Sequence, residues 1–144
     1  MKALTIQQPW ASLIFTPNST NGYFKMIETR SWKTAYRGKI AIHAAKKHNT
    51  KLLQSLNPEL RTIFSDAGIH SDEDTSNMPH GMVIGEVDIV DCVPIELLDG
   101  YRNKYEVAFG DWSGGRYGWV IRNPILYKEP IPAVGKLSLW DWNA

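Results

Sequence analysis

The segment from Met82 to Val93 is the longest run with the alternation of a β-strand, and it constrains the fold more than any other part of the chain. Acidic residues alternate there with Val87 and Ile89, as expected of a strand that buries one face. The alternation slips at Ile89–Val90, which is typical of a β-bulge. A sheet that contains this strand is therefore expected to form the core.

Shorter strand patterns and a few helical patterns surround this segment. Strands are predicted over residues 3–7, 28–32, 39–44, 117–121 and 137–142, and residues 125–127 extend or follow the fourth of these. Helices are predicted over 9–15 and 50–65, and a helical turn is predicted over 23–27. Asn57–Pro58 is typical of a helix start, so 50–65 is either one helix or two in tandem. Loops are predicted over 16–22, 69–81 and 110–118, and the acidic 69–81 loop is expected to be mobile. Together these elements predict an α+β fold, a small mixed β-barrel with inserted helices.

Size and composition fit one globular domain over residues 1–144, because 43% of the residues are hydrophobic and 22% are charged. The one cysteine, Cys92, excludes an internal disulfide and agrees with a reducing compartment. No apolar run is long enough to cross a membrane, and the run that follows Met1 is too short for a signal peptide. We expect a soluble, cytoplasmic protein without a membrane partner; its oligomeric state is not indicated.

Charge is distributed unevenly along the chain. The segment from Lys25 to Lys51 holds eight basic residues and one acid, whereas the segment from Glu59 to Asp99 holds ten acids and one base. Two solvated faces of opposite sign would give this pattern. A compact basic segment is also what a phosphate-binding surface needs, although the net charge of the whole chain is only +1.

The basic segment begins with a motif in which three charged residues can meet. If Lys25 ends a helical turn and Glu28 begins a strand, their side chains come together, and Arg30 points to the same side as Glu28. The carboxylate would orient both cations and leave their outer donors for a phosphate or a base edge. Spacing alone favours an ordinary surface ion-pair cluster, because the pattern is a weak one.

Several stretches together resemble the ASCH domain family, and particularly the ASCH domain of a eukaryotic transcription coactivator. They are QPWASLI (8–14), KMIETRSW (25–32), YRG (36–38), IHAAK (42–46), GMVIGEVDIVDC (81–92) and YGWVIRNP (117–124), followed by Pro130, Gly135–Lys136 and Leu139–Trp140. The resemblance runs nearly from end to end. It implies a PUA-like β-barrel with a ligand cleft between barrel and helices, and it implies binding of RNA or another nucleic acid.

The family motif G-x-K-x-x-E-x-R falls on Gly22, Lys25, Glu28 and Arg30, with one extra residue between Gly22 and Lys25. Some small members resemble hydrolases, either ribonucleases or amidohydrolases of acetylated cytidine; the amidohydrolase type carries threonine at the position of Glu28. The ligand-binding residues predicted from the resemblance and the basic segment are Gln8, Trp10, Lys25, Glu28, Arg30, Trp32, Arg37, Gly38, His43 and Lys46. Trp32 is the expected stacking platform for a base, and His43 is either a core residue or part of the cleft.

Three hypotheses about function remain open. The first is binding of nucleic acid, RNA rather than DNA, or of a nucleotide. The second is hydrolysis of RNA or a modified nucleoside by Lys25 and Glu28, with Lys25 acting either as a neutral base or as a cation beside a Glu28 or His43 base. The third is a protein-interaction module that uses the acidic segment. We expect no cofactor and no metal, because no nucleotide-binding glycine motif and no metal-ligand spacing is present.

Overall fold

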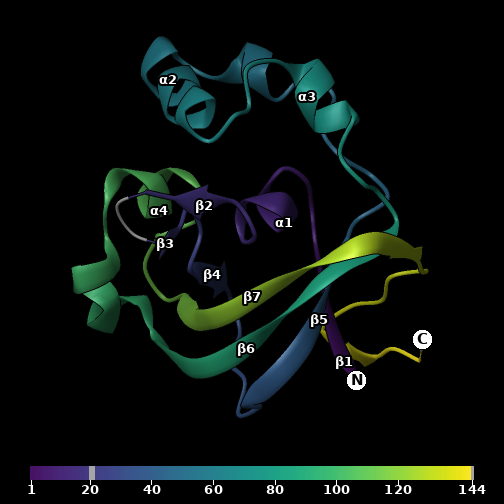
Figure 1. The fold of residues 1–144 in the computed structure, drawn as a ribbon. Helices are drawn as coiled ribbons and strands as arrows, with labels where there is room; N and C mark the ends of the chain where they lie inside the picture. The colour runs from purple at the N-terminus through teal and green to yellow at the C-terminus, as the bar shows by residue number, and fades with distance from the viewer. Residues whose placement is uncertain (20–21, 144) are drawn as a thin grey trace.

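The computed structural model describes residues 1–19 and 22–143, and a curled six-stranded sheet is its main element (Figure 1). The strands of this sheet are β1 (Lys2–Ile6), β4 (Ile27–Arg30), β5 (Gly38–Ala44), β6 (Met82–Pro94), β7 (Tyr117–Pro132) and β8 (Leu139–Asp141). Their order is β4-β7-β6-β5-β1-β8; β1 and β5 are parallel and the other neighbours antiparallel. The prediction of an α+β fold with a small mixed barrel is confirmed, and the sheet forms about half of a barrel.

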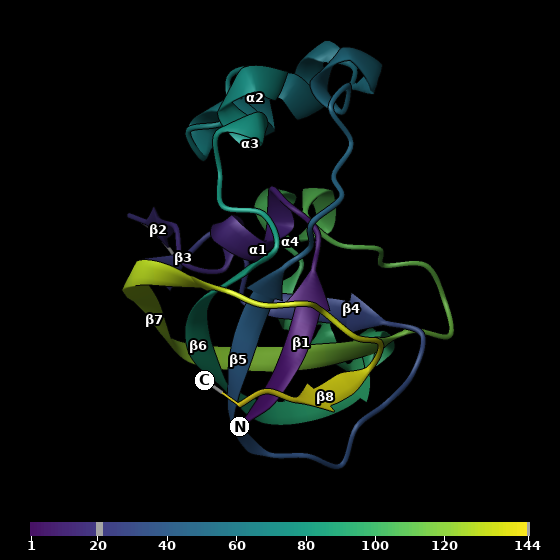
Figure 2. The same ribbon diagram turned by 90° about the vertical axis from the view of Figure 1, so that its right-hand side faces the viewer.

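Short helices and a small hairpin complete the chain. They are α1 (Trp10–Leu13), the hairpin strands β2 (Pro17–Asn18) and β3 (Gly22–Tyr23), the 3-10 helices η1 (Leu53–Ser55) and η2 (Ile95–Tyr101), and the helices α2 (Pro58–Asp66), α3 (Asp72–Ser76) and α4 (Lys104–Ala108). Helices α2 and α3 form a layer above α1, and two chain segments join this layer to the sheet (Figure 2). The two termini lie together at the opposite end, where the Met1 amino group donates to Trp142 O at 3.1 Å.

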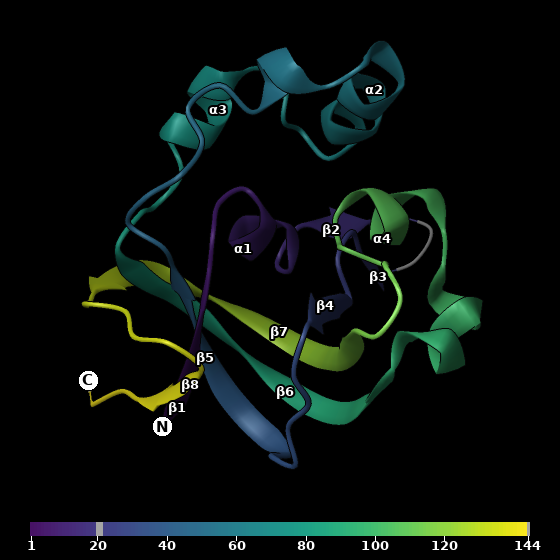
Figure 3. The same cartoon turned by 180° about the vertical axis from the view of Figure 1, so that it is seen from behind.

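The two largest of the four apolar clusters in the described chain hold these layers together. The larger core fills the inside of the curled sheet around Trp119, which is fully buried. The second core joins α2 and the segment that follows it to α1 and α4, through Leu13, Phe64 and Phe109. Helix α4 also packs beside the small hairpin (Figure 3), where Phe24 and Tyr105 meet edge to face with ring centroids 4.9 Å apart. Helix α4 thereby lies beside the start of β4.

Several predicted elements are confirmed. The Asn57 side chain caps α2 by accepting from Leu60 N at 2.9 Å, so the 50–65 segment is indeed two helical pieces in tandem. The ladder between β6 and β7 shifts register between Ile89 and Asp91, where the sequence predicts a bulge. Among the described residues, no helix combines the length and the apolar character needed to cross a bilayer.

Other predicted elements are wrong. The expected 69–81 loop contains α3, because Ser71 and Asp74 form a capping box in which each side chain bonds the other residue's backbone N–H. The expected helical turn over 23–27 is instead the end of β3 and the start of β4, since β2 and β3 pair and Phe24 N donates to Thr16 O. The 16–22 loop contains β2, and residues 20–21 lie outside the described residues. Helices η2 and α4 are absent from the prediction. Residues 125–127 extend the 117–121 strand, which is one of the two alternatives predicted, and β7 continues beyond them to Pro132.

Strands β6 and β7 and the Phe15 ring pack tightly around Gly85, and a Gly85→Ala variant tests this packing. A Cβ at Gly85 would lie 2.5 Å from Ile125 O and 2.6 Å from Phe15 Cε1, which are a backbone atom and a core ring. We expect the variant to lower the free energy of unfolding by about 1–3 kcal/mol in urea denaturation. Gly100→Ala is the matched control, because its Cβ would meet nothing within 4 Å. Equal stability of the two variants would contradict the close approach.

Candidate functional site

The three charged residues of the sequence motif meet as their spacing predicts. Glu28 and Arg30 lie on β4 and point to one side, and Arg30 Nε and Nη2 approach Glu28 Oε2 at 2.9 and 2.8 Å. Lys25 precedes the strand, and its Nζ lies 3.2 Å from Glu28 Oε1. One carboxylate therefore joins two cations, with a different oxygen facing each.

Lys25 is a buried part of this cluster and not an exposed donor. Its side chain is 1% exposed, and Nζ donates to Ile27 O and Phe109 O at 2.8 Å each. With Glu28 these acceptors match the three donors of an ammonium group. Lys25 therefore connects β4 to the end of α4 and positions Glu28, while its own charge stays away from solvent.

A second carboxylate, Glu106 on α4, lies behind the cluster. Its oxygens accept from Met26 N at 2.7 Å and Ile27 N at 3.3 Å. Burial raises the pKa of Glu106 from 4.5 to about 7, although the Met26 N–H, Lys25 and the Ile27 N–H each oppose the rise. The sequence signal for this helix is its cap: the Asn103 side chain accepts from Tyr105 N and Glu106 N.

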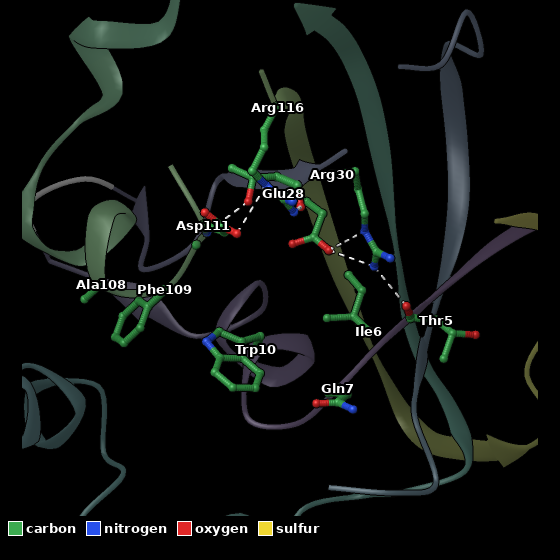
Figure 4. A pocket seen from close by; sticks show the side chains of 12 residues that line it. Thr5, Ile6, Gln7, Trp10, Glu28, Arg30, Ala108, Phe109, Asp111 and Arg116 are labelled. Carbon is green, nitrogen blue, oxygen red and sulfur yellow. Dashed lines mark hydrogen bonds and ion pairs between the residues drawn. The ribbon is translucent and has the colours of Figure 1, made fainter. Parts of the chain in front are cut away.

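An open cavity of about 540 Å³ lies on the other side of Glu28 and Arg30 (Figure 4). Trp10 lies below these two residues in the figure, with Thr5 on the right and Asp111 on the left. The charged residues around it are two arginines and two carboxylates, so the lining is balanced in charge. The lining residues are Thr5, Ile6, Gln7, Trp10, Glu28, Thr29, Arg30, Ala108, Phe109, Gly110, Asp111 and Arg116.

Arg30 is fixed at this cavity by one edge of its guanidinium. Nε and Nη2 bond Glu28, and Nη2 also donates to Thr5 O at 3.0 Å. Among the described residues, Nη1 has no hydrogen-bond partner, and the side chain is 26% exposed. Arg30 therefore presents the two donors of Nη1 in an orientation set by the protein.

Arg116 and Asp111 form the opposite wall. Arg116 Nη2 donates to Thr29 O at 3.1 Å, while its buried Nε has no hydrogen bond within the described chain and lies 3.6 Å from Asp111 Oδ2. The Ser113 hydroxyl and backbone N–H hold the pKa of Asp111 below its usual value, and Arg116 adds to this effect. This wall supplies a fixed carboxylate and a second guanidinium.

Comparison with known proteins agrees with this fold. The family model of the ASCH domain matches residues 4–132. The chain belongs to the ASCH family. It is 27% identical over 145 residues to Activating signal cointegrator 1 of Homo sapiens, and 26% identical over 144 residues to the Mus musculus protein of the same name. Each alignment covers 98% of this chain and 22% of the relative, so the chain spans about a fifth of the length of these proteins. The curled sheet with its helices is consistent with a PUA-like ASCH fold.

Three of the predicted binding residues of this ASCH domain line the cavity, namely Trp10, Glu28 and Arg30, and Lys25 lies behind them. Gln8 is buried; its amide donates to Pro79 O at 3.0 Å and its oxygen accepts from Ser12 N at 2.9 Å. Gln8 therefore joins α1 to the segment that returns from α3. Gln8 is 1% exposed and is not among the residues that line the cavity.

The remaining predicted residues of the ASCH domain lie outside this cavity. Trp32 is half-buried and meets Trp119 edge to face at 4.7 Å, Arg37 faces Asp91 at 3.6 Å, and Gly38 begins β5 with a φ of +110°. His43 is buried, and its ring forms hydrogen bonds with Thr5 Oγ1 at 3.1 Å and Ala133 O at 2.8 Å. This is the environment of a core residue, one of the two roles that the sequence allows for His43. Lys46 and His43 line a different cavity.

The uneven charge of the sequence is partly cancelled in space. Because β5 pairs antiparallel with β6, bases of the first segment face acids of the second. Lys39 Nζ lies 3.2 Å from Glu86 Oε1 and 4.0 Å from Asp88 Oδ1. In the part of the chain that the structure describes, the basic residues of segment 25–51 without an ion pair are Lys33, Lys46, Lys47 and Lys51.

The sequence prediction missed most of the cavity wall. Thr5, Gln7, Asp111 and Arg116 are absent from the predicted site, although the glycine-rich stretch 110–118 marks the loop that carries two of them. No three His, Cys, Asp or Glu side chains come together as a metal site among the described residues.

Proposed function

We propose that this domain binds single-stranded nucleic acid, RNA rather than DNA, and that one nucleobase enters the cavity at Arg30. The observation that supports this proposal is the guanidinium of Arg30, which uses Nε and Nη2 within the protein. Its Nη1 donors remain available at an open cavity of about 540 Å³. An arginine held in this way can donate two hydrogen bonds to the edge of a base. The partly exposed Trp10 offers a π-face beside it.

The charges of the lining support a base in this cavity more than a phosphate. Glu28 and Asp111 would repel a phosphate, and they offset Arg30 and Arg116 in number. The same four residues give a mixture of donors and acceptors, which is what a base edge requires. The predicted role of the basic segment therefore divides. Its motif Lys25-Glu28-Arg30 supports base recognition, while Lys46, which makes no ion pair within the described chain, is left to contact the nucleic-acid backbone.

The position of Lys25 supports binding over hydrolysis at this site. A lysine that acts as a base needs a free lone pair directed at the substrate. Lys25 Nζ instead donates to two carbonyl oxygens and faces Glu28, with 1% of the side chain exposed. Glu28 is likewise engaged through both oxygens. Incubation with acetylated cytidine and short RNAs should therefore give no turnover.

Binding is tested with Arg30→Lys and Trp10→Ala against labelled eight-nucleotide RNA and DNA pools. Arg30→Lys keeps the charge but loses the planar fork, so it should weaken binding by about 1–3 kcal/mol. Trp10→Ala should cost about 1–3 kcal/mol if the indole stacks on a base. Fluorescence anisotropy at low salt measures both losses, and RNA should bind more tightly than DNA.

Trp32→Ala is the control, because Trp32 lies outside the cavity and packs on Trp119. Trp10→Phe keeps an aromatic face and should retain most of the affinity, while thermal unfolding of each variant separates lost binding from lost folding. If Arg30→Lys and Trp10→Ala leave the RNA affinity unchanged while Trp32→Ala abolishes binding, the site lies at the Trp32 surface and the proposal is refuted.

A further inference from the structure

A second, larger cavity of about 790 Å³ lies beside the first. It is formed by Thr5 of β1, the ends of β5 and β7, the residues just before β6 and the segment between β7 and β8, which crosses β5 and β1 in yellow in Figure 2. Apolar side chains contribute strongly, among them Val134 and Leu137, which are 86% and 92% exposed. Its lining residues are Thr5, His43, Ala45, Lys46, His80, Gly81, Pro132, Ala133, Val134, Gly135, Lys136 and Leu137.

The titratable residues around the second cavity are lysines and histidines, with no acid among its lining residues. Lys46 and Lys136 are both exposed, and neither makes an ion pair within the described chain. Asp141 lies outside the lining and pairs with Lys2 at 3.0 Å. The second cavity thus differs from the first, where two carboxylates oppose two arginines.

Thr5 is shared by the two cavities. Its carbonyl accepts from Arg30 Nη2 at 3.0 Å on the side of the first cavity. Its hydroxyl lies 3.4 Å from Lys136 O and 3.1 Å from His43 Nδ1 on the side of the second. Arg30 and the backbone of Lys136 are therefore linked through this one residue.

His43 and Gly135 fix the position of Lys136. A Cβ at Gly135 would lie 2.7 Å from His43 Cε1 and 2.8 Å from Thr5 Oγ1, so the segment after β7 lies directly on these side chains. His43 also bonds Ala133 O at 2.8 Å. The buried histidine is a positioning residue that keeps this segment, and with it Lys136, against β1.

We infer that the second cavity binds the phosphate backbone of the strand whose base occupies the first cavity, through Lys46 and Lys136. This inference rests on the proposed function of the first cavity. The charge-balanced cavity suits a base, the uniformly basic one suits phosphate, and both are lined by Thr5. The exposed apolar side chains Val134 and Leu137 give the neighbouring sugar or base a non-polar surface.

The test compares Lys46→Ala/Lys136→Ala with Lys33→Ala/Lys128→Ala, a control pair of exposed lysines outside both cavities. The probes are a nucleoside, an eight-nucleotide RNA and inorganic pyrophosphate. The first double variant should weaken RNA binding about tenfold or more and flatten the slope of log K against log salt by about 0.7 per lost phosphate contact. Nucleoside binding should stay unchanged, and the control pair should have little effect on any probe.

Pyrophosphate separates failure of this inference from failure of the proposed function. In NMR titrations it should shift the amide signals of Lys46, Gly81 and Lys136 in the unmodified protein but not in the Lys46→Ala/Lys136→Ala variant. Absent shifts, an unchanged salt slope, or an equal loss in the control pair overturns the inference. If pyrophosphate binds there while neither nucleoside nor RNA responds to Arg30→Lys, the base site fails and the phosphate site stands.

Discussion

Replacing Lys25 by methionine is expected to lower the free energy of unfolding by about 3–5 kcal/mol. The substitution leaves Glu28 buried without one of its two cations, and it leaves Ile27 O and Phe109 O without their donor. Methionine has a similar volume, so the loss reflects missing charge and hydrogen bonds and not a cavity. Urea denaturation measures the difference, with Lys33→Met as the exposed lysine control.

A double variant checks this interpretation. Lys25→Met together with Glu28→Gln removes the stranded charge, so it should be more stable than the sum of the two single losses implies. A Lys25→Met protein that keeps its stability but no longer binds RNA would contradict the scaffold role of Lys25. That result would place the ammonium in contact with the ligand, as the sequence motif alone suggests.

The local features of the fold were accessible from the sequence because they depend on periodicity and spacing. The alternation along Met82–Val93 predicts β6 and its bulge, and Asn57–Pro58 predicts the start of α2. The meeting of Lys25, Glu28 and Arg30 follows in the same way from their positions just before and along β4. Each of these patterns spans a few residues, so no knowledge of distant contacts is needed.

Features that depend on contacts between distant segments were not accessible. The pairing of β5 with β6 brings Lys39 to Glu86 and Arg37 to Asp91, so two bases of the basic segment are paired with acids from the acidic segment. Arg116 and Asp111 reach the cavity only because the loop after α4 returns to Thr29 on β4. Short capped helices were also missed, because Asp74 looks like part of an acidic loop until its carboxylate is seen to bond the backbone of Ser71.

The position of Glu106 predicts that the protein loses stability as pH rises from about 4.5 to about 7. The pKa of Glu106 is about 7 in the folded protein against 4.5 as its ordinary value, so the folded state holds the proton more tightly than the unfolded chain. A carboxyl group with a raised pKa therefore contributes to the free energy of unfolding in full below pH 4.5, and this contribution declines until the pH passes 7. The full difference corresponds to about 3–4 kcal/mol, since each pKa unit is worth about 1.4 kcal/mol.

Urea denaturation at several pH values measures this slope, and Glu106→Gln should remove it. Glutamine stays neutral at every pH, so the variant never has a buried charge at this position. It keeps one oxygen for the N–H groups of Met26 and Ile27, and the loss of the other hydrogen bond should lower the free energy of unfolding by about 1 kcal/mol. The substitution leaves every other titratable side chain in place, so the difference in slope between the two proteins isolates Glu106. Glu96→Gln, at an exposed position, should leave the slope unchanged. If Glu106→Gln keeps the original slope, Glu106 stays ionised in the fold, and the N–H groups of Met26 and Ile27 together with Lys25 outweigh its burial.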